Sequence, residues 1–154
     1  MSIQTDNRIE ARVDLSAAVP DLYRAMLRLD GAVTKTSLDQ DLLNLIQLRA
    51  SQINRCVYCI DLHTTDARAA GESEQRLHAV GAWAEAPYYT ERERMALALT
   101  EHITLLSDRG VPDDLWEQAG EHFSAEERAE LVFAATAINA WNRLAVTTRM
   151  VPGT

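Results

Sequence analysis

Three helix-start signals divide most of this sequence into helical segments. Each is a Ser or Thr followed three residues later by Glu or Gln, so that both side chains can cap free N–H groups of a first turn. Apolar residues then recur at helical spacing, and no segment alternates apolar and polar residues as a half-buried strand would. The sequence therefore predicts an all-α fold. The signals begin at Ser37, Thr90 and Ser124, and the helices they open are expected to reach about Asn54, Ser107 and Val146.

Weaker signals complete a single-domain bundle of about seven helices. Proline suits a first helical turn, which predicts helices from Pro20 and from Pro112, and Gly71 is placed to end the helix before it. The last helix is apolar nearly all round over residues 133–146, so we expect it to be central. The predicted domain spans residues 16–150, after an extended arm at residues 1–15.

Charge and hydropathy limit the partners. The chain of 154 residues has a net charge of −8, which argues against a nucleic-acid surface. No apolar run approaches the roughly 18 residues of a membrane span, and no export signal is visible. We expect a cytoplasmic protein without a cofactor, in a compartment where a Cys-x-x-Cys motif is more often catalytic or metal-binding than a structural disulfide.

The only two cysteines, Cys56 and Cys59, are followed by a histidine at His63. If Cys56 begins a helix, all three lie on one face, and Cys59 and His63 are one turn apart. A helix N-terminus favours a thiolate, and His63 can exchange protons with it. Cys56 can then condense with a sulfenic acid at Cys59 to form a disulfide.

Two other interpretations of the motif remain open. The cysteines could be inert core residues, or they could bind zinc with His63. A structural zinc site needs a fourth ligand, and the sequence has no second Cys-x-x-Cys or His pair to supply it. Thioredoxin-type motifs follow a strand, which the helical pattern does not provide.

These residues, with their surroundings, resemble the AhpD-like alkylhydroperoxidases of the carboxymuconolactone decarboxylase superfamily. The resemblance covers roughly residues 15–150 and implies an all-α fold, homo-oligomers (trimers or hexamers), and thiol peroxidase or disulfide reductase chemistry. It is carried by LRASQIN (48–54), CVYCIDLH (56–63), GE (71–72), RL (76–77), Trp83, ERERMALALT (91–100), VPD (111–113), HFS (122–124) and INAWNR (138–143).

The resemblance also implies roles for single residues. Cys59 would be the peroxidatic cysteine, Cys56 the resolving cysteine, and His63 part of a proton relay. The relay glutamate of the family falls at Asn44, which cannot accept a proton at neutral pH. Tyr58 stands where some members have a histidine, and Arg55 replaces a common glycine. Asn44, Tyr58 and Arg55 are therefore possible relay or pocket residues.

Two further features carry structural expectations. A polar, uncharged stripe of residues 40, 44, 47, 51 and 54 is expected on an exposed or subunit-facing side rather than in the wall of an active site. Trp141, on an otherwise apolar helix, is expected in the core rather than against a substrate.

The predicted function is reduction of small organic hydroperoxides by a Cys56/Cys59 redox pair assisted by His63. An external dithiol or a lipoyl-bearing protein would regenerate the dithiol. The alternatives are a carboxymuconolactone decarboxylase-like enzyme, whose chemistry needs no dithiol, and a non-catalytic redox-sensing or zinc-binding oligomer.

Overall fold

A computed structural model of the chain describes residues 9–153, and these residues form helices without a strand, which confirms the all-α prediction. The expected arm is only partly covered, because residues 1–8 lie outside the described part. Its remainder runs extended toward the end of the last helix, where the Arg12 backbone N–H donates to the Thr148 carbonyl at 2.8 Å.

The described part contains nine α-helices and one short 3₁₀ helix, η1, where about seven helices were expected. The two additional α-helices, α1 and α7, are only four residues long. The helix expected to reach Ser107 ends at Thr104, and α7 follows it after a break at Leu105. The elements are α1 (Leu15–Ala18), α2 (Pro20–Val33), α3 (Gln40–Ile53), α4 (Val57–Ala69), α5 (Glu74–Ala79), η1 (Val80–Ala82), α6 (Glu91–Thr104), α7 (Leu106–Arg109), α8 (Asp113–Ala119) and α9 (Ala125–Thr148).

Two of the three helix-start signals form the predicted capping boxes. Thr90 caps α6 and Ser124 caps α9, each with the glutamate three residues on. The prediction at Ser37 is wrong, because Asp39 is the N-cap of α3 and makes no side-chain cap. Ser37 instead donates its hydroxyl to Glu130 of α9 at 2.6 Å, a long-range contact that a local pattern does not reveal.

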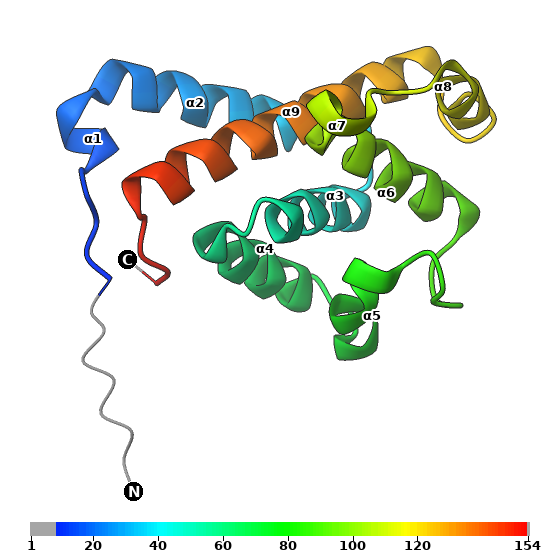
Figure 1. Cartoon of the computed structure of the whole chain (residues 1–154), viewed down its shortest axis with the longest axis horizontal. Helices are drawn as coiled ribbons and strands as arrows, with labels where there is room; N and C mark the ends of the chain where they lie inside the picture. Colours follow the sequence, from blue (N-terminus) through cyan, green and yellow to red (C-terminus); the bar gives the residue numbers. More distant parts are fainter. Residues whose placement is uncertain (1–8, 154) are drawn as a thin grey trace, which may run out of the picture.

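Helix α9 is central, as expected, and packs against α2, α3, α4 and α6 (Figure 1). Its polar residues Asn139 and Asn142 are buried along with four of its alanines, whereas Phe133 and Val146 are exposed despite being apolar. A cluster of buried apolar side chains joins α3, α4 and α9 and contains both cysteines with Ala50, Ile138 and Ala145. The dithiol is thus part of the packed interior rather than of a surface loop.

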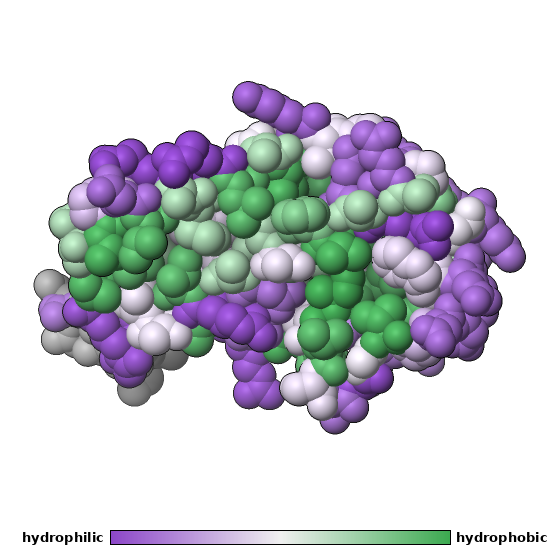
Figure 2. Space-filling view, turned by 90° about the horizontal axis from the view of Figure 1, so that it is seen from above, coloured by the Kyte–Doolittle hydropathy of each residue, from purple (hydrophilic) through white to green (hydrophobic). Residues whose placement is uncertain are grey.

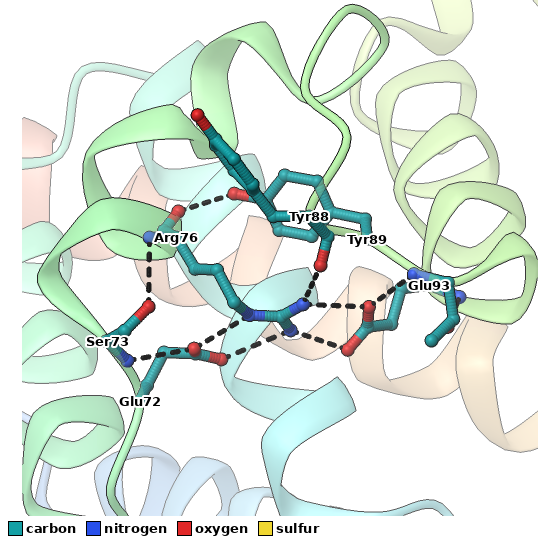
Figure 3. Close-up of polar contacts among 7 residues, drawn as sticks. Glu72, Ser73, Arg76, Tyr88, Tyr89 and Glu93 are labelled. Carbon is teal, nitrogen blue, oxygen red and sulfur yellow. Dashed lines mark hydrogen bonds and ion pairs between the residues drawn. The ribbon is translucent and has the colours of Figure 1, made fainter.

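Arg76 fixes the segment between α5 and α6. Its guanidinium binds Glu72 at 2.8 Å and Glu93 at 2.6 Å, and it also donates to the Tyr88 carbonyl (Figure 3). Tyr89 donates its hydroxyl to the Arg76 carbonyl and lies under the guanidinium. Because Glu93 also completes the α6 capping box, this one arginine ties α5, the connecting loop and the first turn of α6 together.

Candidate functional site

The two cysteines lie where the chain turns from α3 into α4. Arg55 makes the turn in the left-handed region at φ 55°, a backbone conformation that glycine adopts without strain. Cys56 is the N-cap of α4, and Cys59 and His63 follow on the buried face of the helix. Their exposed fractions of 1%, 3% and 9% confirm the predicted inward-facing arrangement.

Cys56 holds the stabilised thiolate of the pair. Its Sγ accepts the backbone N–H of Cys59 at 3.3 Å, and both thiols are free. A hydrogen bond from the Cys59 thiol, together with that N–H, lowers the pKa of Cys56 to about 7 despite burial. The same thiol contact, followed by burial, raises the pKa of Cys59. The N-terminus of α4 therefore favours ionisation at Cys56 over ionisation at Cys59.

Polar residues of α3 and α9 surround the buried side of the dithiol. Asn142 donates to the Ser51 hydroxyl at 3.0 Å, and its amide also lowers the pKa of both cysteines through hydrogen bonding. Asn54 donates to the side-chain oxygens of Asn142 and Asn139, each at 2.9 Å. These contacts satisfy the amides within one chain.

The polar stripe of α3 consequently needs correction. Asn44, Gln47 and Ser51 are buried within the chain, and only Gln40 is exposed. Ser51 contributes to the site by lowering the pKa of Cys59. Asn44 is 3% exposed and accepts a hydrogen bond from Gln40 at 3.1 Å.

A cavity of about 120 Å³ opens beside Cys59 and His63 between α2, α4 and α9. Cys59 lines it, whereas Cys56 does not. Trp141 packs against the core cluster that contains the cysteines, as expected, and it also lines the cavity, where its ring meets that of Tyr23 edge to face with 5.8 Å between the centroids. The lining residues are Tyr23, Leu27, Asp30, Tyr58, Cys59, Leu62, His63, Trp141, Ala145 and Met150.

Burial also shifts the pKa values of His63 and Asp30, which line the cavity with Cys59. Burial lowers the pKa of His63 to about 4, against the opposing effect of the Asp66 carboxylate, so the imidazole is neutral near pH 7. Its Nδ1 has no hydrogen-bond partner among the described residues. Burial also raises the pKa of Asp30, a shift that the Trp141 side chain opposes by hydrogen bonding and Asp66 increases.

The structure brings together four of the six residues singled out from the sequence. Cys59, His63 and Tyr58 line the cavity and Cys56 contacts Cys59, but Asn44 and the exposed Arg55 do not line it. Sequence reasoning missed Tyr23 and Asp30, because α2 has no motif and only its packing brings them to α4 and α9.

Residues 9–153 contain no candidate metal site and no candidate membrane span. No group of three or more His, Cys, Asp or Glu side chains in this range is placed to hold a metal ion. None of the helices in this range combines the length and the apolar character that a membrane-spanning segment requires.

Known proteins share both the sequence and the fold. The carboxymuconolactone decarboxylase family model matches residues 20–102. Protein YdfG of Bacillus subtilis, which is uncharacterised, is 38% identical over 135 residues, covering 88% of this chain and 92% of that protein. YnjA of Escherichia coli, also uncharacterised, is 28% identical over 97 residues, 63% of this chain and 53% of that protein.

Solved structures extend the likeness. A protein of unknown function from Agrobacterium tumefaciens, described as a putative antioxidant defence protein AhpD, superimposes with a TM-score of 0.91 at 37% identity, over 94% of this chain and 99% of that one. A peroxidase-related protein from Ralstonia eutropha with an AhpD core shares the fold at 23% identity and a TM-score of 0.80, over 90% and 74% of the two chains. This chain belongs to the carboxymuconolactone decarboxylase family and has the AhpD-like fold.

Proposed function

We propose that this protein is a thiol-dependent peroxidase that reduces small organic hydroperoxides through Cys59, Cys56 and His63. One observation carries the proposal: Cys59 lines a cavity next to His63, while Cys56 contacts Cys59 without lining the cavity. A substrate in the cavity would meet Cys59 first, and the second thiol would already be positioned for disulfide formation. The site therefore supports the order of roles that the family resemblance implied.

The pKa values refine the first step. When the dithiol ionises, the lowered pKa of Cys56 favours the negative charge there, and the Cys59 proton then moves to Cys56 along their hydrogen bond. The Cys59 thiolate attacks the terminal oxygen of the hydroperoxide, the O–O bond breaks, and the alkoxide leaves as alcohol with a proton relayed by His63 and water. Cys59 becomes a sulfenic acid, which still carries the hydrogen of the attacked oxygen.

The second step closes the disulfide. Cys56 first loses the proton it received from Cys59 through the relay of His63 and water. The Cys56 thiolate then attacks the sulfenic sulfur of Cys59. Hydroxide leaves and is protonated to water. An external dithiol, such as a small dithiol or a lipoyl-bearing protein, then reduces the disulfide by thiol–disulfide exchange. If this thiol–disulfide exchange is the main activity, the protein is a disulfide reductase.

A homo-oligomer, trimer or hexamer, is part of the proposal. Hydrophobic residues gather on the face seen from above in Figure 2, along which α2 and α9 run in Figure 1. Leu22 of α2 and Phe133 of α9 are 67% and 61% exposed. Large exposed apolar areas support association. Light scattering coupled to gel filtration should show a multiple of 17.2 kDa that Phe133→Glu reduces.

The function is tested with reduced protein and one equivalent of cumene hydroperoxide, following hydroperoxide loss and free thiols. Wild type should lose two thiols for each hydroperoxide consumed. Cys59→Ser should consume none, whereas Cys56→Ser should complete one turnover and leave a sulfenic acid that dimedone traps at Cys59. Equal loss of activity in both variants would refute the assigned roles.

Further measurements separate the two alternatives from the peroxidase. A decarboxylase-like enzyme would keep its activity toward a lactone substrate when both cysteines are replaced by serine. A redox sensor would lose its thiols to the hydroperoxide but would not recover them with a dithiol at a rate that sustains turnover. Stoichiometric zinc in protein purified without a chelator would favour the zinc-binding oligomer.

A further inference from the structure

The cavity beside Cys59 has an unusual combination of walls for a site proposed to bind small organic molecules. Three aromatic side chains line it, from three different regions of the sequence: Tyr23 on α2, Tyr58 on α4 and Trp141 on α9. The Tyr23 and Trp141 rings are perpendicular within 11°, at an interplanar angle of 79°, and so form a corner. Aromatic faces of this kind attract cations through the ring quadrupole.

The charges around the cavity also favour binding of a cation. Asp30 lines the cavity beside Trp141, and no Lys or Arg is among the described residues that line it. From α4 the facing titratable groups are Tyr58, Cys59 and His63, with Asp66 nearby, and α9 contributes only uncharged side chains. His63 is neutral near pH 7, so the fixed charges near the cavity are negative.

Burial raises the pKa of Asp30, which means that its charge is incompletely compensated within the chain. A bound cation would supply the missing compensation in a partly desolvated site, where Coulomb attraction is stronger than in water. An anion in the same place would face repulsion from Asp30 and from the dithiol. The negative charges and the aromatic walls of the cavity therefore both favour a cation over an anion.

We propose that the Cys59 cavity recognises a substituted ammonium group, seated against Tyr23 and Trp141 and paired with Asp30. This inference rests on the proposed function, because it names the substrate class of that site: hydroperoxides that carry an organic cation, or that are uncharged, are accepted over those that carry a carboxylate. Asp30 is then the residue that determines charge specificity.

Three compact probes of similar shape test the proposal: tetramethylammonium, tert-butanol and pivalate. Their binding to the reduced full-length protein is measured by ligand-observed NMR at constant ionic strength. Tetramethylammonium should bind at least about tenfold more tightly than tert-butanol, the size expected for a cation between aromatic rings and a carboxylate. Pivalate should bind most weakly.

Variants separate the cavity from general surface charge. Asp30→Asn should bring the tetramethylammonium and tert-butanol affinities within about twofold of each other, and Trp141→Leu should weaken only the cation. Asp61→Asn is the control, since Asp61 is an exposed carboxylate of α4 that does not line the cavity. If Asp30→Asn does not fold, Tyr23→Leu provides the same comparison. Equal affinities for the three probes, no binding, or cation binding that survives Asp30→Asn would overturn the inference.

A competition assay connects binding to catalysis. Tetramethylammonium should inhibit reduction of tert-butyl hydroperoxide by wild type competitively, and pivalate should not. If the wild type consumes no hydroperoxide, the proposed function fails, whereas the binding experiment still decides the charge preference. If hydroperoxide is consumed but tetramethylammonium neither binds nor inhibits, only this inference fails.

Discussion

The backbone N–H of Cys59 donates to Cys56 Sγ at 3.3 Å, so that the first cysteine of the motif is the N-cap of the helix that carries the second. This relationship separates two properties that a nucleophilic cysteine usually combines. The lowered pKa belongs to Cys56, and access to the cavity belongs to Cys59. A single proton shared between the sulfurs would allow either of them to carry the charge.

The first prediction concerns which thiol ionises. In wild type, carbon-13 NMR of the cysteine Cβ atoms should reveal one group that titrates near pH 7, at Cys56. Cys59→Ala removes the thiol donor and should raise the pKa of Cys56, whereas Cys56→Ser removes the neighbouring anion and should lower the pKa of Cys59 below its wild-type value. A group titrating near pH 7 that the NMR shifts assigned to Cys59 would contradict the assignment.

Asn142 should support both the thiols and the fold. Asn142→Ala removes an amide that favours both thiolates. It also removes one hydrogen bond each from Ser51 and Asn54. We expect the pKa of Cys56 to rise and the free energy of unfolding in urea to fall by about 1–3 kcal/mol. Asn139→Ala is the matched control: it breaks the contact with Asn54 and should destabilise comparably without moving the thiol pKa. A similar thiol shift in both variants would rule out a specific role for Asn142.

Arg55 should carry backbone strain that glycine relieves. Its φ of 55° lies in the left-handed region, where a side chain costs roughly 1 kcal/mol that glycine avoids. Arg55→Gly should therefore raise the free energy of unfolding by up to about 1 kcal/mol. Arg149, which also has a φ of 55°, offers a second test at the end of α9. If Arg55 also stabilises the thiolate, Arg55→Gly would raise the pKa of Cys56, an effect that Arg149→Gly should lack.

His63 should make the fold sensitive to acid. Its pKa falls from 6.5 to about 4 on folding, so the unfolded chain binds more protons between these values and stability rises with pH across this window. Above pH 6.5 the protonation of His63 does not reduce the free energy of unfolding. By pH 4 it reduces that free energy by about 3 kcal/mol. Urea unfolding of wild type and His63→Gln at several pH values checks this. The variant should lose less stability over the same range, and parallel curves would refute the prediction.

Local chemistry predicted those parts of the protein that depend on residues close together in the sequence. The capping boxes at Thr90 and Ser124 formed because cap and first turn lie within four residues. Cys56, Cys59 and His63 share a buried face because helical geometry places positions three, four and seven residues apart on one side. The family resemblance identified the fold, although Ser37 failed as a cap because Glu130, far along the chain, competes for its hydroxyl.

The packing of the helices against one another decided the remaining features of the site. Tyr23 and Asp30 reached the site because α2 packs against α9, and Asn44, Gln47 and Ser51 became buried because α3 lies against α9. Which sulfur carries the charge depends on the orientation of one N–H and on burial, and the sequence shows neither. The sequence by itself determined the helices and the reactive groups, since those follow from short-range periodicity and side-chain chemistry. Only the tertiary structure decided the walls of the cavity, because they come from helices that are distant in sequence.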